Sequence, residues 1–295
     1  MYHRFGESKY PSTNITVEQL ESHLNYLVEQ NFRFTQASDL LDPEQQKEKT
    51  ITVTIDDAYL SFYEVGLPIF EKYQVPVTLF LNTENVGGFN YMSWDQLRDV
   101  LDRGVEIQNH SHTHSSFSTL DEEAIINEIE TSQSLIFANL NITPNLFAFP
   151  FGESSDMAQK VIERYFDAAF GQHSGAFSMN YQYYIPRFPL NENYGSLDRL
   201  REISKSLPFE AAQLQPSNPT LNPPSTRFVL DVEGGVNGVN CFISDFQGSI
   251  EKQMTTLENK LLIELSRIPV SGRLRFNCTR VDDGIFWYGH QYFIN

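Results

Sequence analysis

Short apolar runs alternate with stretches of helical periodicity between residues 51 and 170. The runs are rich in β-branched and aromatic residues, as is typical of buried strands. They lie at 51–55, 77–81, 105–108, 146–149 and 167–170. Helical spacing between and before them predicts helices at 16–30, 61–73, 93–103, 121–140 and 156–165. Repeated strand–helix units predict a parallel sheet with right-handed crossovers, either a barrel or a doubly wound sheet.

The pattern changes after Leu207. Prolines at 208, 216, 219, 223 and 224 interrupt any helical spacing and indicate a linker or domain crossing. The later segments 227–230, 241–243 and 285–288 are strand-like, whereas 249–265 fits one helix or a strand. We therefore expect an α/β domain over 1–205 and a small β-rich domain over 206–295. Its role stays open between carbohydrate binding and packing or dimerisation.

Composition narrows the classes of partner. Apolar residues make up 40% of the chain and the net charge is −17, so a sizeable core is expected and a nucleic-acid partner is excluded by repulsion. No apolar run approaches the ~20 residues of a transmembrane helix, and the chain start shows no signal peptide. The surplus of Asn, Ser, Thr, Tyr and Phe over Lys favours an extracytoplasmic protein. Oligomeric state is left open.

The two cysteines, Cys241 and Cys278, both lie in the strand-rich C-terminal part. Two are too few for a disulfide framework, and neither belongs to a Cys-x-x-Cys metal motif. They fit either one bridge in an exported protein or two buried thiols.

Polar residues follow the ends of the predicted strands. Asp56-Asp57, the cluster at 110–114, the loop 150–152 and His173 each come after a strand. Because the carboxyl ends of parallel strands converge on one rim, where α/β folds build active sites, these residues can meet despite their separation in sequence.

The cluster His110-Ser111-His112-Thr113-His114 is the strongest local signal. Residues four apart share one face of a helical turn, so His110 and His114 can converge on one ion while His112 points elsewhere. Two imidazoles and one carboxylate leave a position for water, as in a catalytic zinc site. The alternatives are a solvated histidine loop and, for Asp56-Asp57, a capping or surface turn.

Three segments resemble the motifs of the polysaccharide deacetylases (carbohydrate esterase family four). They are Thr54-Ile55-Asp56-Asp57-Ala58, His110-Ser111-x-x-His114 and Phe149-Pro150-Phe151-Gly152, and 167–171 resembles a fourth region. The resemblance covers about residues 2–200 and implies a distorted (β/α) barrel. It also implies a divalent metal, zinc with cobalt or nickel as alternatives, held by Asp57, His110 and His114. Asp56 would be the general base.

The chain departs from the family pattern at three places. Ala58 replaces the usual glycine, a mild change if its φ stays negative. Asn145 and Leu146 stand where an arginine normally orients the base, so Arg187 is the candidate replacement, its alternative being a surface ion pair. No Leu-x-His motif follows His173.

The missing motif leaves the general acid to be assigned. Members similar to circularly permuted poly-N-acetylglucosamine deacetylases carry this histidine on the first strand, which favours His3, with His173 as the competitor. The backbone N–H of Phe151 is the expected oxyanion donor. His23 and His290 are interpreted as structural or surface residues.

The resemblance implies a hydrolase that removes N-acetyl groups from an amino-sugar polysaccharide or oligosaccharide and releases acetate. Two alternatives remain: an O-acetyl glycan esterase with the same metal site, and an inactive glycan-binding protein. The sequence does not indicate which glycan is bound.

Overall fold

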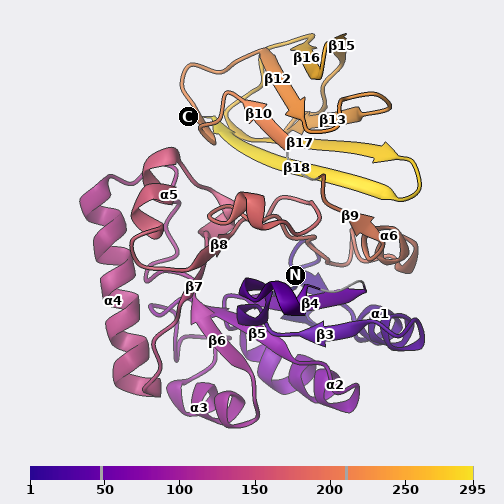
Figure 1. Cartoon of the computed structure of the whole chain (residues 1–295). Helices are drawn as coiled ribbons and strands as arrows, with labels where there is room; N and C mark the ends of the chain where they lie inside the picture. Colours follow the sequence, from indigo (N-terminus) through magenta and orange to yellow (C-terminus); the bar gives the residue numbers. More distant parts are fainter. Residues whose placement is uncertain (47–48, 210–211, 295) are drawn as a thin grey trace.

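The computed structural model describes residues 1–46, 49–209 and 212–294. Its centre is a six-stranded parallel sheet in the order β3-β4-β5-β6-β7-β8 (Figure 1). These strands are β3 (Arg33–Thr35), β4 (Thr50–Asp56), β5 (Val77–Leu81), β6 (Glu106–Asn109), β7 (Leu146–Ala148) and β8 (Ala168–Phe170). Each strand neighbours the next in sequence, whereas a doubly wound sheet reverses its order. The distorted (β/α) barrel is therefore confirmed.

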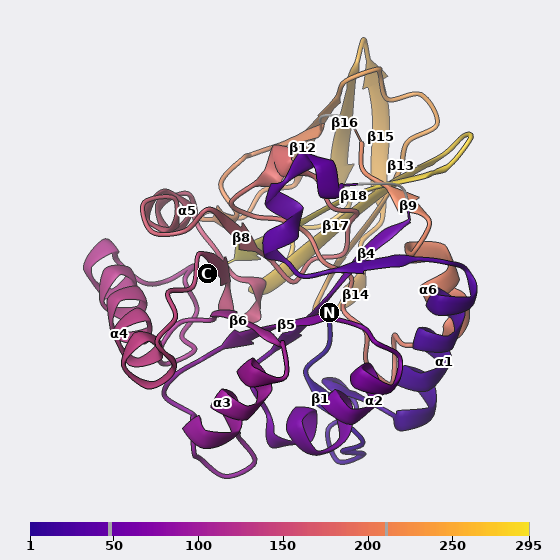
Figure 2. The same cartoon turned by 60° about the horizontal axis from the view of Figure 1, so that its bottom comes forward.

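The helices predicted from periodicity are present outside the sheet. Helices α1 to α4 follow one another around it (Figure 2). The bounds are α1 (Val17–Glu29), α2 (Leu67–Lys72), α3 (Trp94–Asp102), α4 (Glu122–Leu140), α5 (Asp156–Ile162) and α6 (Leu197–Ile203). The segment expected to be one helix at 61–73 begins instead with a π turn, Phe62–Gly66. At α3, Ser93 and Gln96 form a capping box, which satisfies free amides of the first turn.

Short elements complete the barrel part. Single-turn 3₁₀ segments lie at Ser38–Leu41, Pro43–Gln45, Pro150–Gly152 and Met179–Tyr181. A small parallel pair joins β1 (Arg4–Phe5) to β2 (Asn14–Ile15). Just before β1, Tyr2 bridges to Ile55 on β4. The start of the chain thus runs beside the end of β4.

The C-terminal part consists of two antiparallel-rich sheets, which confirms the β-rich expectation. One has the order β10-β12-β16-β15 and the other β11-β18-β17-β13-β14, with β9 pairing β18. Their bounds are β9 (Ser206–Leu207), β10 (Ala212–Gln215), β11 (Thr220–Leu221), β12 (Arg227–Val232), β13 (Asn240–Asp245), β14 (Gly248–Ser249), β15 (Lys252–Leu257), β16 (Lys260–Leu265), β17 (Gly272–Val281) and β18 (Ile285–Ile294). The segment 249–265, for which the sequence allowed either a helix or a strand, contains strands β15 and β16.

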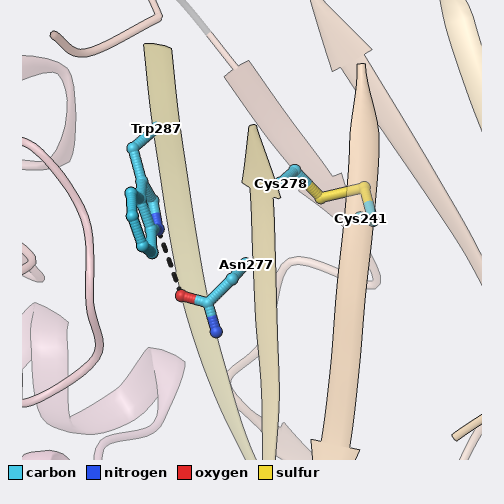
Figure 3. Close-up of a disulfide and its surroundings, with 4 residues drawn as sticks. All are labelled: Cys241, Asn277, Cys278 and Trp287. Atoms are coloured by element: carbon cyan, nitrogen blue, oxygen red, sulfur yellow. Dashed lines mark hydrogen bonds between the residues drawn. A yellow bond between two sulfur atoms is a disulfide. The ribbon is translucent and has the colours of Figure 1, made fainter. Parts of the chain in front are cut away.

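Cys241 and Cys278 form a disulfide between β13 and β17 (Figure 3). The two residues are direct partners in the strand register and belong to the buried core of this region. Of the two alternatives for these cysteines, the bridge is therefore correct. By closing a loop it restricts the unfolded chain and stabilises the sheet.

The hairpin β17–β18 packs directly on the barrel. Arg273 forms an ion pair with Glu153 at 3.0 Å, and Gln291 donates to the carbonyl of Gly152 at 3.2 Å. At Gly289 the backbone approaches Ser174 so closely that a Cβ would lie 1.6 Å from its carbonyl oxygen, so only glycine fits. The hairpin therefore covers one rim of the barrel (Figure 1). The domain boundary near residue 205 stays a prediction.

None of the described helices is long and apolar enough to cross a bilayer.

Candidate active site

A triad of possible metal ligands lies at the carboxyl ends of β4 and β6. Ligand atoms of Asp57, His110 and His114 all fall within 4.8 Å of one another. The Nε2 atoms of His110 and His114 lie 3.4 Å and 3.1 Å from Asp57 Oδ1. Burial alone would raise the pKa of Asp57, but its close contacts with both imidazoles hold this pKa well below its usual range.

The residues of this triad fit a divalent cation. His110 Nδ1 bonds to the carbonyl oxygen of Ala148 at 2.7 Å, so Nδ1 carries the proton and Nε2 presents its lone pair. Nε2 is buried and has no hydrogen-bond partner in the described part of the chain. A cation bound by this lone pair, His114 and the carboxylate would satisfy it, with coordination positions left over.

The loop that carries the histidines is not a helical turn, so that expectation was wrong. Ser111 and His114 have positive φ values of 72° and 60°, and hydrogen bonds shape the loop instead. The Glu128 carboxylate of α4 accepts from the backbone N–H groups of His112 and Thr113. His112 turns away to bond Thr83 at 2.8 Å, as expected. Left-handed backbone, rather than i,i+4 spacing, brings the two ligands together.

Asp57 and Ala58 also have left-handed backbone, with φ of 77° and 56°. The condition under which the replacement of glycine would be mild, a negative φ at Ala58, is therefore not met. An L-residue there costs roughly 1–2 kcal/mol relative to glycine, which explains the usual glycine in the motif. Hydrogen bonds from Asp57 N to Phe80 O and from Met92 N to Ala58 O hold the turn.

Asp56 is fully buried and forms a two-pronged ion pair with Arg187. Arg187 Nη1 and Nη2 donate to its two carboxylate oxygens at 2.7 Å and 2.8 Å, and Nε donates to Gly171 O. Burial opposes ionisation, but the guanidinium keeps the pKa of Asp56 below its usual value. Arg187 is itself 7% exposed. The alternative of a surface ion pair is therefore excluded.

His3 reaches the same rim through the bridge of the first residues to β4. Tyr2 N donates to Thr54 O at 2.9 Å, and Asp56 N donates to Tyr2 O at 3.0 Å. His3 is half-buried; burial lowers its pKa, whereas the charges of Asp57 and Asp56 act in the opposite direction.

His173, the competing candidate for the general acid, is buried. Its ring lies 4.5 Å from the ring of Tyr184, and Nδ1 has no hydrogen-bond partner among the described residues. Burial holds the pKa of His173 well below its usual value, and the charges of His290 and Arg187 add to this effect. Arg187 thus disfavours the protonated form of both histidines, but only His3 has the charges of Asp56 and Asp57 acting in favour of it.

A cavity of about 720 Å³ opens over this rim, within the range of ligand sites. Its wall includes His3, Asp57, His114, Phe151 and His173. The ring of Phe151 packs edge-on against His114 at 4.4 Å. His110, Asp56 and Arg187 lie buried behind this wall. The structure therefore gathers all the predicted site residues, while their chemical roles stay predictions.

The sequence analysis missed several residues of this cavity. Gln172 donates to Asp56 Oδ2 at 3.4 Å. The C-terminal hairpin contributes Arg273, Arg275, Asn277, Trp287 and His290. Alternation of polar residues with Leu274, Phe276 and Cys278 marks an outward polar face on β17, but it does not reveal what that face covers. His290, interpreted as structural or surface, is half-buried and lines the cavity.

Fold and site together define a distorted (β/α) barrel with a candidate Asp-His-His metal centre. Residues 44–165 match the family model described as polysaccharide deacetylase. Over this segment the chain is therefore similar to the polysaccharide deacetylase family. The circular permutation linked to His3 stays a prediction.

Two curated relatives are similar over much of the chain. The Bacillus subtilis protein YxkH, a candidate polysaccharide deacetylase, is 21% identical over 168 residues, which is 56% of this chain and 60% of YxkH. The Staphylococcus aureus poly-beta-1,6-N-acetyl-D-glucosamine N-deacetylase is 24% identical over 209 residues, 64% of this chain and 72% of that protein.

Solved structures share the barrel. The Streptococcus pyogenes deacetylase PplD in complex with acetate has a TM-score of 0.64 at 19% identity, covering 69% of this chain and 96% of PplD. IcaB from Ammonifex degensii has a TM-score of 0.58 at 19% identity, covering 69% of this chain and 93% of IcaB. At these identities the likeness concerns the fold alone.

Proposed function

We propose that this protein is a metal-dependent deacetylase that hydrolyses N-acetyl groups of an amino-sugar polysaccharide or oligosaccharide. The observation that carries the proposal is the placement of the buried Asp56–Arg187 pair beside the triad Asp57, His110 and His114. Binding of a glycan needs no buried carboxylate next to a cation site, whereas hydrolysis needs a base there. The N-deacetylase activity of the S. aureus relative supports N-acetyl groups as the target.

Asp57, His110 and His114 would hold the cation, and zinc suits this donor set. When bound, it supplies Lewis acidity toward the acetyl carbonyl and the attacking water. Asp56 accepts a proton from that water as its oxygen adds to the acetyl carbon. The Phe151 backbone N–H stabilises the developing oxyanion.

His3 donates a proton to the sugar nitrogen as the C–N bond breaks, which leaves a free amine and acetate. Arg187 keeps Asp56 ionised and oriented through its paired hydrogen bonds. The disulfide and the family's polysaccharide substrates support an extracytoplasmic location.

Acetate release from two kinds of glycan tests this proposal. The zinc-loaded protein should release acetate from N-acetylglucosamine oligomers, lose this activity after chelation, and regain it with added zinc. Acetylated xylan is the comparison substrate. Acetate from xylan alone would support an O-acetyl esterase instead. Binding of the oligomers without acetate release from either substrate would indicate an inactive glycan-binding protein.

Substitution of the two candidate acids separates their roles. His3→Ala should lower kcat by about 10²–10⁴-fold, the usual contribution of a general acid, whereas His173→Ala should retain most activity. His112→Ala is the matched control, because His112 bonds Thr83 on the outer side of the same loop. An unchanged rate in His3→Ala beside an inactive His173→Ala would assign the acid role to His173.

A further inference from the structure

The cavity above the candidate metal centre has a positively charged wall, in a chain whose net charge is −17. Arg199, Arg273 and Arg275 all line it, and Asp57 is the one acidic lining residue in the described ranges. With a divalent cation on Asp57, that remaining negative charge would be neutralised as well. A surplus of positive charge therefore lies where substrate would bind.

Two of these arginines have no carboxylate partner in the described part of the chain. Arg273 is paired with Glu153, but Arg199 and Arg275 form no ion pair there. Among the described residues, the buried Nε of Arg199 has no hydrogen-bond partner and its Nη2 reaches Ser174 Oγ at 3.5 Å. Burial lowers the pKa of Arg199, and the nearby charge of Glu202 offsets this only in part.

The arginines reach the cavity from two different parts of the chain. Arg199 belongs to α6 of the barrel part, and its guanidinium lies 5.8 Å from the centre of the Tyr194 ring, which also lines the cavity. Arg275 belongs to β17 and is exposed on the face opposite the buried Leu274 and Phe276. Tyr194 acts electrostatically on both arginines, so an anionic group bound beside Tyr194 would lie near both.

A surface with an aromatic ring and a side-chain amide adjoins Arg275. The indole N–H of Trp287 donates to Asn277 Oδ1 at 3.1 Å, and both side chains project from the hairpin away from the disulfide (Figure 3). The bond occupies the oxygen of Asn277 and leaves its amide N–H groups to bond a ligand. The other side of Trp287 packs on Phe188 of the barrel part at 5.1 Å, which fixes the ring.

We propose that the C-terminal hairpin makes this enzyme selective for an acidic glycan, in which the N-acetylated sugar neighbours a sugar bearing a carboxylate or similar anionic group. Arg275 and Arg199 bind that group, and Trp287 with Asn277 positions the adjoining ring. The inference rests on the proposed function and adds the substrate class. It assigns the β-rich region a role in recognition rather than packing alone.

Binding to a matched pair of oligosaccharides tests this inference. The probe is a hexasaccharide of alternating N-acetylglucosamine and glucuronic acid, and its control is the same molecule with each carboxylate reduced to an alcohol. Dissociation constants are measured by calorimetry in Asp56→Asn protein, so that turnover does not disturb the equilibrium. We expect the acidic form to bind about tenfold or more tightly, with an affinity that falls as salt is raised.

Arg275→Gln and Arg199→Gln should each weaken binding of the acidic probe about tenfold. Each should change the dissociation constant of the reduced probe by less than about twofold. Arg227→Gln is the matched control, since this exposed arginine on β12 carries the same charge outside the cavity wall. Equal affinity for the two probes, no detectable binding of the acidic one, or an equal loss in Arg227→Gln would overturn the inference.

Acetate release by the wild-type protein distinguishes failure of the inference from failure of the proposed function. If acetate is released from both hexasaccharides and the two bind with equal affinity, the acidic selectivity is refuted and the deacetylase function is retained. A preference for the acidic probe without acetate from any glycan supports the selectivity and refutes the deacetylase function.

Discussion

Asp57→Ala should abolish metal retention and reduce acetate release by at least about a thousandfold, because Lewis-acid assistance contributes several kcal/mol. The carboxylate is the one charged ligand of the triad and lies within 3.4 Å of both imidazole Nε2 atoms. Without it, two neutral imidazoles remain. Elemental analysis after dialysis, beside an acetate assay, measures both effects.

Asp56→Asn is the matched control for this prediction. It removes a charge from the neighbouring residue but leaves the triad intact, so the metal should stay bound while activity falls by about 10²–10⁴-fold through loss of the base. Full metal content and full turnover in Asp57→Ala would refute the metal site. Loss of metal in both variants would show that the two carboxylates do not have separate roles.

Arg187→Ala should lower the free energy of unfolding by about 3–5 kcal/mol, because it leaves the buried Asp56 carboxylate without its partner. Activity should fall with it, since the base loses both hydrogen bonds that orient it. Denaturant unfolding measures the first effect. Arg201→Ala removes a guanidinium from an exposed pair with Asp198 and should cost less than about 1 kcal/mol.

A double variant separates the effect of Arg187 on the orientation of Asp56 from its effect on the stability of the fold. Asp56→Asn together with Arg187→Ala leaves no buried unpaired charge, so it should recover part of the lost stability without recovering activity. Similar unfolding midpoints for Arg187→Ala and Arg201→Ala would contradict the prediction. They would mean that Asp56 is solvated or protonated when Arg187 is absent.

The local elements of the barrel and the identity of the ligand triad could be predicted because they depend on short-range information. Strands β4 to β8 are apolar runs bounded by helices, and the parallel order places Asp57 and His110 on one rim. Arg187 was predicted only as a replacement for an arginine missing from a motif. Its pairing with Asp56 joins residues 131 positions apart, and no local pattern encodes such a contact.

The backbone conformation at the site could not be predicted from the sequence pattern. Spacing of four suggested a helical turn at His110 to His114, yet left-handed residues held by Glu128 form a loop there. Ala58 likewise has a positive φ despite its Cβ. In both cases tertiary hydrogen bonds outweigh a local preference of only about 1–2 kcal/mol.

The sequence by itself determined which residues are candidates for the chemistry, since strand ends, histidine spacing and motif order all lie within short segments. Only the tertiary structure decided what covers them. The polar alternation of β17 shows that a face exists, but not whether it meets solvent, a partner or the barrel. That choice depends on the fit between distant surfaces, such as Gly289 against Ser174, and such complementarity arises only once both are folded.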